Sequence, residues 1–295
     1  MSTATFPLVH RLDPVLAADA HEGPVYLPED DALCFTTRAG AIRRAALDGS
    51  ARVDEVPAAV CAANGMTLAA DRRSLIVCEQ GSLDTPARIS VVDPATGRVE
   101  PLADASAGLP LNSPNDVAVA PDGAIWFTDP SYGFLQGFRP APRQPDAVHR
   151  LDPSDGRAAV AATGFDKPNG LCFAPGGAVL YVNDSGVNQE PGSHYPDRPH
   201  HVRAFDVADG WRLAGGDVVA DVSPGQPDGM KCDAEGRVYV SCASGVLVLA
   251  PSGERLGEIP VAGAVNFCFG GPDRDRLFIT TGTAVWSAVL HTRGA

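Results

Sequence analysis

Six oxygen-bearing side chains recur along this 295-residue chain, each at the start of an apolar segment. Each is a carboxylate or a primary amide, and several of the segments lead into a Pro, Asp or Gly turn and a second apolar segment. The intervals of roughly 40–60 residues indicate a structural repeat. If the repeats form a ring, all six side chains point toward one place on its axis. The residues are Glu22, Asn64, Asn115, Asn169, Asp228 and Asn266.

Carboxylate and amide oxygens gathered at one place favour a hard cation. Ca²⁺ takes about 6–8 oxygen ligands at roughly 2.3–2.6 Å. Glu22 and Asp228 would supply negative charge and the asparagines neutral carbonyls, a mixture that does not suit soft metals. Asn or Asp before Gly also serves turns, but that role does not explain six residues in phase. We expect Ca²⁺, with Mg²⁺, Mn²⁺ and Zn²⁺ left open, although no Cys and His spacing typical of zinc is present.

The segments that must position these residues are mostly short runs that are apolar or that alternate between apolar and polar residues. Examples are AIWFTD, VLYVND and RVYVSC. They are typical of strands, and long amphipathic helical periodicity is absent. Repeats that each hold several short strands indicate a β-propeller. We therefore predict an all-β fold: one six-bladed β-propeller domain over residues 1–295 with a central metal-binding tunnel. Residues 187–201 are predicted to be a long loop in the fourth unit, and whether it acts as a lid is left open.

Charge, hydropathy and cysteine usage limit the classes of partner. The net charge of −13 argues against binding nucleic acid or an anionic membrane. No segment has the roughly 18 apolar residues of a membrane span, and the N-terminus lacks a signal-peptide pattern. The seven cysteines, mostly within apolar strands, are expected to be reduced core residues. We expect a cytoplasmic protein, either a monomer or a small homo-oligomer.

Four motifs together resemble the family of gluconolactonase, senescence marker protein and luciferin-regenerating enzyme. They are HEGPVY at 21–26, LNSPNDVAVAPDGAIWFTDPSYG at 111–133, PNGLCFAPGGAVLYVNDSG at 168–186 and PDGMKCDAEGRVYVSC at 227–242. The second block is the most specific, and the similarity is strongest to the gluconolactonase branch. It spans roughly residues 18–288. The resemblance implies a six-bladed propeller with a divalent cation in its tunnel and activity on sugar lactones.

The site residues that the resemblance implies follow from these motifs. Glu22, Asn169 and Asp228 match the metal ligands, and Asn115 matches a residue that binds metal, substrate or both in relatives. Regucalcin-type relatives have a substrate-binding Arg two residues before that Asn, where this chain has Ser113. The segment after LIVCE also departs from the family pattern, because it runs Gln-Gly-Ser-Leu-Asp at 80–84. These departures concern the substrate more than the metal.

We therefore expect a Ca²⁺-dependent lactonase. The cation would polarise the lactone carbonyl and stabilise the oxyanion. Asp228 is the candidate catalytic base, and a metal-bound water is the alternative. No Gly-x-Ser-x-Gly motif indicates a serine nucleophile. Asn115, Asp129 and Tyr132 are the candidate substrate-binding residues, the last two because they follow a second strand that returns to the metal end.

Two other functions remain open for such a scaffold. The same ion could polarise a P=O group in a phosphotriesterase-like hydrolase. A non-hydrolytic metal-binding propeller is the second alternative, since propellers host many functions. The two carboxylates in the tunnel argue against a propeller that binds only proteins. The expected partner is a small, hydroxylated lactone that is neutral or weakly charged.

Overall fold

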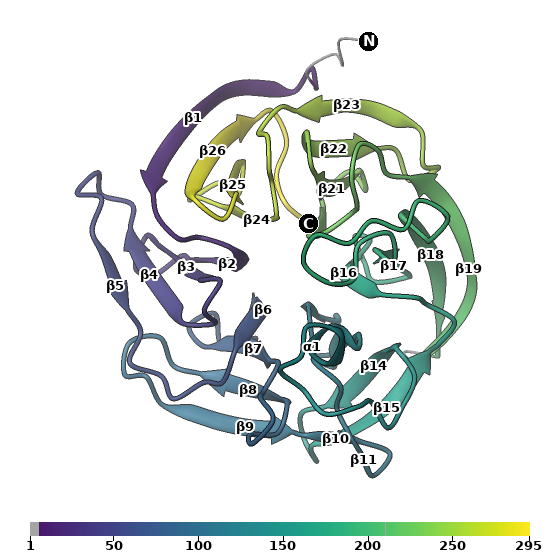
Figure 1. Cartoon of the computed structure of the whole chain (residues 1–295). Helices are drawn as coiled ribbons and strands as arrows, with labels where there is room; N and C mark the ends of the chain where they lie inside the picture. Colours follow the sequence, from purple (N-terminus) through teal and green to yellow (C-terminus); the bar gives the residue numbers. More distant parts are fainter. Residues whose placement is uncertain (1–5, 210) are drawn as a thin grey trace.

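The computed structural model describes residues 6–209 and 211–295, and across them six four-stranded antiparallel sheets surround one axis. The prediction of an all-β, six-bladed β-propeller is confirmed (Figure 1). Each sheet is one blade, numbered here in chain order. The innermost strands are β2 (Glu22–Leu27), β6 (Ala63–Leu68), β12 (Val117–Val119), β16 (Pro168–Phe173), β20 (Met230–Cys232) and β24 (Asn266–Gly270).

The first three blades continue outward from their innermost strands by consecutive hairpins. Blade one adds β3 (Ala32–Thr36), β4 (Ile42–Ala46) and β5 (Val53–Glu55). Blade two adds β7 (Leu75–Glu79), β8 (Arg88–Val92) and β9 (Val99–Ala103). Blade three adds β13 (Ile125–Asp129), β14 (Ala147–Asp152) and β15 (Arg157–Ala162).

The last three blades follow the same plan, except that the sixth takes its outer strand from the beginning of the chain. Blade four adds β17 (Val179–Asp184), β18 (His201–Ala208) and β19 (Arg212–Asp221). Blade five adds β21 (Val238–Cys242), β22 (Gly245–Leu249) and β23 (Arg255–Ile259). Blade six adds β25 (Arg276–Thr280), β26 (Ala284–Leu290) and β1 (Val9–Ala17).

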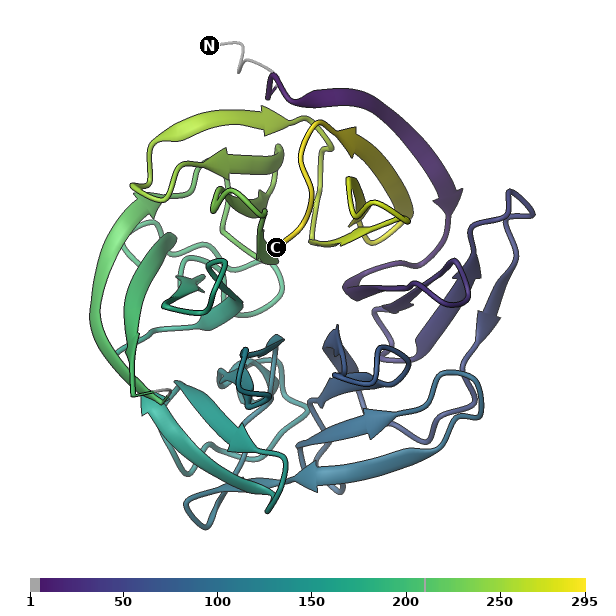
Figure 2. The ribbon, with the colours of Figure 1, turned by 180° about the vertical axis from the view of Figure 1, so that it is seen from behind.

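Strand β1 closes the ring, a feature that the repeat pattern did not reveal. It pairs antiparallel with β26, and Leu12 lies opposite Ala288. Figures 1 and 2 show β1 on the outer edge of this blade, before the chain turns inward to β2. The first and last parts of the chain therefore share one sheet, so that ladder hydrogen bonds hold the ring closed.

All six innermost strands run in the same direction, and this gives the ring two distinct ends. We call the end where they begin the loop face. It also holds the connections between the second and third strands of each blade, including residues 130–146 and 185–200. We call the opposite end the turn face, because the innermost strands meet their hairpin turns there, as at 69–74 and 271–275. The predicted long loop at 187–201 lies in blade four on the loop face.

The apolar core lies between neighbouring blades. Between blades one and two, for example, Val25 and Cys34 pack with Met66 and Val77. The cysteines are free, and all but the half-buried Cys61 are buried, as expected of reduced core residues. No described helix has the length and apolar character to cross a membrane. Two small elements were not predicted, the hairpin β10 (Ala105–Ser106) and β11 (Leu109–Pro110), and the helix α1 (Tyr132–Leu135).

Candidate active site on the loop face

The six recurring donors occupy equivalent places around the loop face. Glu22 and Asn266 are the first residues of their innermost strands, and Asn64 and Asn169 are the second residues of theirs. Asn115 and Asp228 stand two residues before β12 and β20. The phase that the sequence pattern predicted is therefore present in the structure. The functional role of each donor stays a prediction.

Glu22 and Asp228 form the acidic centre of this end of the tunnel. Glu22 is buried, and its Oε2 accepts a hydrogen bond of 2.7 Å from the Asn266 amide. Burial raises the pKa of Glu22. Burial also raises the pKa of Asp228 well above its usual range, the negative charge of Glu22 raises it further, and a hydrogen bond from Asn169 opposes the shift. Two adjacent buried carboxylates, of which one raises the pKa of the other, are a suitable place for a positive charge.

Asp116 adds a third carboxylate that the sequence analysis did not single out. It is buried, and its Oδ2 has no hydrogen-bond partner among the described residues. Burial raises its pKa to about 6, the Lys231 ammonium 4.0 Å away lowers it, and the charge of Glu22 raises it. The signal that could have found it is its place directly after Asn115 in the ND motif.

These residues fit a hard divalent cation. An orphaned carboxylate oxygen, two adjacent buried carboxylates and neighbouring amides are the donor chemistry of Ca²⁺ and Mg²⁺ sites. Across residues 6–209 and 211–295, no three His, Cys, Asp or Glu side chains are grouped closely enough to hold a metal by themselves. Amide oxygens would therefore have to complete the ligand set. A bound cation would favour the ionised carboxylates and reverse the direction of their pKa shifts.

Glycines explain how the donors of neighbouring blades come so close. A Cβ on Gly170, directly after Asn169, would lie 2.1 Å from the main-chain oxygen of Asp228 in the next blade. A Cβ on Gly65 would lie 2.3 Å from the main-chain oxygen of Asn115. The glycines of the Asn-Gly pairs are thus places where two innermost strands touch and a side chain cannot fit.

Polar side chains on the second strands fix the main chain of several donors. Each of these side chains donates a hydrogen bond to the main-chain carbonyl oxygen of one of the six recurring residues, which lies in the next blade. Thr36 Oγ1 donates to Asn64 at 3.1 Å, Thr128 Oγ1 to Asn169 at 2.7 Å, and Asn183 Nδ2 to Asp228 at 2.5 Å. These bonds couple the blades at the height of the site and restrict how far the donors can move apart.

Tyr132 lies at this site, as the sequence analysis expected. It is the first residue of α1 and is buried, and its hydroxyl has no hydrogen-bond partner among the described residues. Burial raises the pKa of Tyr132 well above its usual range, and the charge of Asp228 raises it further. A neutral phenol near Asp228 can donate its proton to a ligand oxygen.

Ser113, where regucalcin-type relatives have an arginine, supports the loop that carries Tyr132. It is fully buried, and its hydroxyl donates to the Pro130 carbonyl at 2.6 Å and accepts from the Gly133 amide at 2.9 Å. Arg139 is buried next to the same loop, and its guanidinium donates to the carbonyl oxygens of Asn112 and Ser82 at 2.9 and 2.6 Å. Both residues are thus occupied within the protein.

The Asp129 carboxylate is bonded to the main chain inside the protein, whereas a substrate ligand needs to be open to the substrate. It is fully buried, and its two carboxylate oxygens accept the backbone N–H groups of Asn112 and Ser113, each at 2.8 Å. Asp184 does the same in blade four, with bonds of 2.8 and 2.7 Å from Asp166 and Lys167. The equivalence indicates that these carboxylates shape the segments leading to Asn115 and Asn169. The geometry disfavours direct substrate contact by Asp129.

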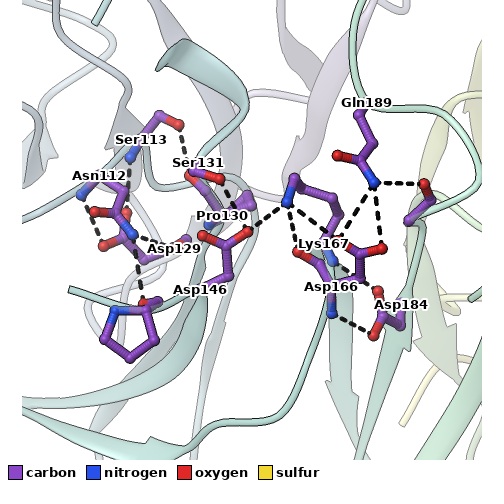
Figure 3. A network of polar contacts seen from close by, with 12 residues as sticks. Asn112, Ser113, Asp129, Pro130, Ser131, Asp146, Asp166, Lys167, Asp184 and Gln189 are labelled. Carbon is purple, nitrogen blue, oxygen red and sulfur yellow. Dashed lines mark hydrogen bonds and ion pairs between the residues drawn. The ribbon is translucent and has the colours of Figure 1, made fainter. Parts of the chain in front are cut away.

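A continuous polar network connects the two segments that carry Tyr132 and Asn169 (Figure 3). The Lys167 ammonium contacts Asp146 Oδ2 at 2.8 Å, and the same oxygen accepts from Ser131 at 3.1 Å. Lys167 and Asp146 are both largely shielded from solvent. Since Ser131 precedes Tyr132 and Lys167 lies two residues before Asn169, this ion pair keeps α1 against the Asn-Gly motif.

Comparison with known proteins identifies the family of this chain. The family described as "SMP-30/Gluconolactonase/LRE-like region" matches residues 20–283. This chain belongs to that family. It is 31% identical over 287 residues to the gluconolactonase of Zymomonas mobilis, covering 87% of this chain and 75% of the relative.

Solved structures of family members superpose over nearly the whole ring. A gluconolactonase from Xanthomonas campestris has a TM-score of 0.82 and 33% identity, covering 97% of this chain and 91% of the other. A putative gluconolactonase from a structural genomics programme has a TM-score of 0.84 and 31% identity, covering 98% and 95%. The calcium-binding regucalcin of Agrobacterium tumefaciens, at 20% identity and a TM-score of 0.70, covers 99% and 96% and shows the shared fold.

Proposed function

We propose that this protein is a divalent-cation-dependent hydrolase that opens a sugar-type lactone. The observation that carries the proposal is the buried Glu22–Asp228 carboxylate pair beside Asn169 and Tyr132 at the start of the innermost strands. Two relatives, one compared by sequence and one by structure, are named gluconolactonases. Their names point to the lactone as the substrate class.

Glu22, Asn169 and Asp228 would hold the cation, with Asn115 and Asp116 beside them. When bound, the cation would act as a Lewis acid on the lactone carbonyl, and Ca²⁺ is the occupant that we favour. Its charge would keep Asp228 ionised, and Asp228 would accept a proton from the attacking water. The Asn266 amide fixes the orientation of Glu22 through its bond to Oε2.

The remaining residues of the site would orient the substrate. The unpartnered Tyr132 hydroxyl can donate to a ring or hydroxyl oxygen of the lactone. Asn115 would contact a sugar hydroxyl through its amide. Ser113 is neutral and engaged with Pro130 and Gly133, so the loop supplies no cation at the position of the family's arginine. A neutral or weakly charged lactone therefore suits this site better than a strongly anionic one.

The Asp228→Asn variant tests the proposal directly. The amide can still offer its carbonyl oxygen to a cation but cannot take a proton, so kcat should fall far more than Ca²⁺ affinity. Lactone ring opening is followed in a pH-stat, with a fluorophosphate ester as a parallel substrate. A variant that binds Ca²⁺ normally and keeps more than about a tenth of the wild-type kcat would exclude Asp228 as the base. Faster turnover of the ester would contradict the lactone assignment.

A further inference from the structure

A cavity lies in the ring, on the turn-face side of the carboxylate site. It has a volume of about 830 Å³ and is lined by residues from the innermost strands of all six blades. Its wall begins about two residues beyond each donor, for example at Pro24 after Glu22 and at Leu171 after Asn169. A strand rises by roughly 3.3 Å per residue, so this cavity extends toward the turn face. We call it the turn-face chamber.

The walls of the turn-face chamber are mostly apolar. Its apolar lining includes Met66, Leu68, Val119, Leu171 and Phe173. Lys231 also contributes to the wall, and its ammonium lies 4.0 Å from Asp116 Oδ2. None of the six recurring donors contributes to the lining. The chamber is therefore chemically different from the acidic site at the other end of the ring.

Positive charge gathers at the mouth of the chamber. Arg72 and Arg274 line it from the hairpin turns of blades two and six, and Asp31 is the one acidic residue of the described lining. Partial burial lowers the pKa of Arg274, and the nearby charges of Arg72 and Arg293 lower it further.

None of these three arginines has an Asp or Glu carboxylate within 4.0 Å among the described residues. Arg274 donates to the main-chain oxygen of Ala295, and Asp31 accepts from the Tyr26 hydroxyl at 2.9 Å. Many other arginines of this acidic chain are paired with a carboxylate, as Arg73 is with Glu29. With Arg274 in contact with Ala295, Arg72 and Arg293 are the cations at this mouth that have no such contact among the described residues, and positive charge around an apolar cavity attracts an anion that also has an apolar body.

We propose that the turn-face chamber binds an amphipathic monocarboxylate. Its carboxylate would contact Arg72 and Arg274 at the mouth, and its hydrocarbon body would pack on Leu68, Val119 and Phe173. An arginine–carboxylate contact supplies charge-assisted hydrogen bonds, and burial of the hydrocarbon supplies the remaining affinity. The proposal is independent of the activity on the loop face, since it uses none of the residues placed there.

Binding of sodium octanoate to the intact protein, measured by isothermal titration calorimetry at low ionic strength, tests this site. Octanoate should bind more tightly than 1-octanol, and its affinity should fall as salt is added. The double variant Arg72→Gln/Arg274→Gln should weaken octanoate by roughly tenfold or more and leave octanol nearly unchanged. Val119→Phe, which fills the apolar wall, should weaken both compounds.

Arg157→Gln is the matched control, because Arg157 is an exposed arginine on an outer hairpin of blade three. This variant should bind octanoate like the wild type, and melting temperatures check that every variant is folded. Octanoate that binds no better than octanol, or equally well to the double variant, overturns the proposal. Competition between octanoate and a lactone substrate would also overturn it, because it would place octanoate on the loop face.

Discussion

The Asn183 amide donates a 2.5 Å hydrogen bond to the main-chain carbonyl of Asp228, in the neighbouring blade. Its side-chain oxygen accepts from the Gly170 N–H at 3.1 Å, so one buried amide ties the segment after Asn169 to the segment that carries Asp228. The distance between two proposed metal ligands is therefore set by a residue that is not itself a ligand.

Replacing Asn183 by leucine should lower both stability and cation affinity. The change leaves the Asp228 carbonyl and the Gly170 N–H without partners, and each unpaired buried group costs about 1–3 kcal/mol. Urea unfolding should show the loss of stability, and calcium titration should show weaker binding in the fraction that stays folded. Asn183→Asp retains only the acceptor for Gly170 and should again bind Ca²⁺ more weakly than the wild type. Unchanged calcium affinity in both variants would show that the bridge does not position the ligands.

Gly170→Ala should disrupt the contact between blades four and five. The added Cβ would lie 2.1 Å from the Asp228 oxygen, so the strands must separate and the ligand set must widen. We expect a destabilisation of at least about 2 kcal/mol together with weaker cation binding. Gly176→Ala is the control: Gly176 has φ +82° and nothing within 4 Å of a Cβ, so this change reports only the backbone cost. Equal calcium affinity in the two variants would argue against the close-contact explanation.

Asp129→Asn distinguishes a supporting carboxylate from a substrate ligand. Because an asparagine offers only one acceptor, one of the Asn112 and Ser113 N–H groups loses its partner, at a cost of about 1–3 kcal/mol. Its melting temperature should fall, and kcat should fall with it as the segment before Asn115 loosens. A variant with wild-type stability and a raised KM alone would restore Asp129 as a direct substrate contact.

His149 should make the protein sensitive to acid. It is fully buried beside Asp129, its Nδ1 pairs with Ser106 Oγ at 2.9 Å, and burial lowers its pKa from 6.5 to about 4. The unfolded chain takes up this proton below pH about 6.5 and the native protein does not. The stability contributed by neutral His149 is thus present above that pH and is lost as the pH falls toward 4.

Asp129 changes the stability in the opposite direction to His149 over the same pH range. Burial raises its pKa to about 7, so the native protein takes up a proton there that the unfolded chain takes up only near the ordinary pKa of 3.8. This gain in stability as the pH falls offsets part of the loss from His149. The His149→Phe variant lacks the loss of stability caused by His149, so only the gain from Asp129 remains. From pH 7 to 4.5, stability of this variant relative to the wild type should increase by about 2 kcal/mol, as measured by urea unfolding. A constant difference between the two proteins would contradict the neutral burial of His149.

The sequence predicted the ring and the phase of the donors because both depend on local patterns. The innermost strands begin at Glu22, Asn169 and Asp228 or within two residues of them, as the motifs indicated. Closure of the ring by β1 was not predicted, because VHRLDPVLA carries no signal that identifies β26 as its partner.

The prediction for Asp129 shows the limit of strand-end reasoning. A carboxylate at the end of a returning strand can face the tunnel or cap the backbone of the preceding segment, and the sequence is the same in both cases. Asp116 was overlooked for a related reason, since an ND pair does not show that its second member is buried without a partner. Contacts of the Asp129 carboxylate with the main chain of the segment before its own blade, and the burial of Asp116 near Lys231 of another blade, decide these cases.

The most direct test of the account is lactone ring opening by protein stripped of divalent metal, before and after Ca²⁺ is returned. The rate is followed by pH-stat with glucono-δ-lactone, with spontaneous hydrolysis subtracted. We predict that the stripped protein has no rate above background and that Ca²⁺ restores it in wild type but not in Asp228→Asn. Full activity of the stripped protein, with no response to added Ca²⁺, would contradict a cation held by Glu22, Asn169 and Asp228.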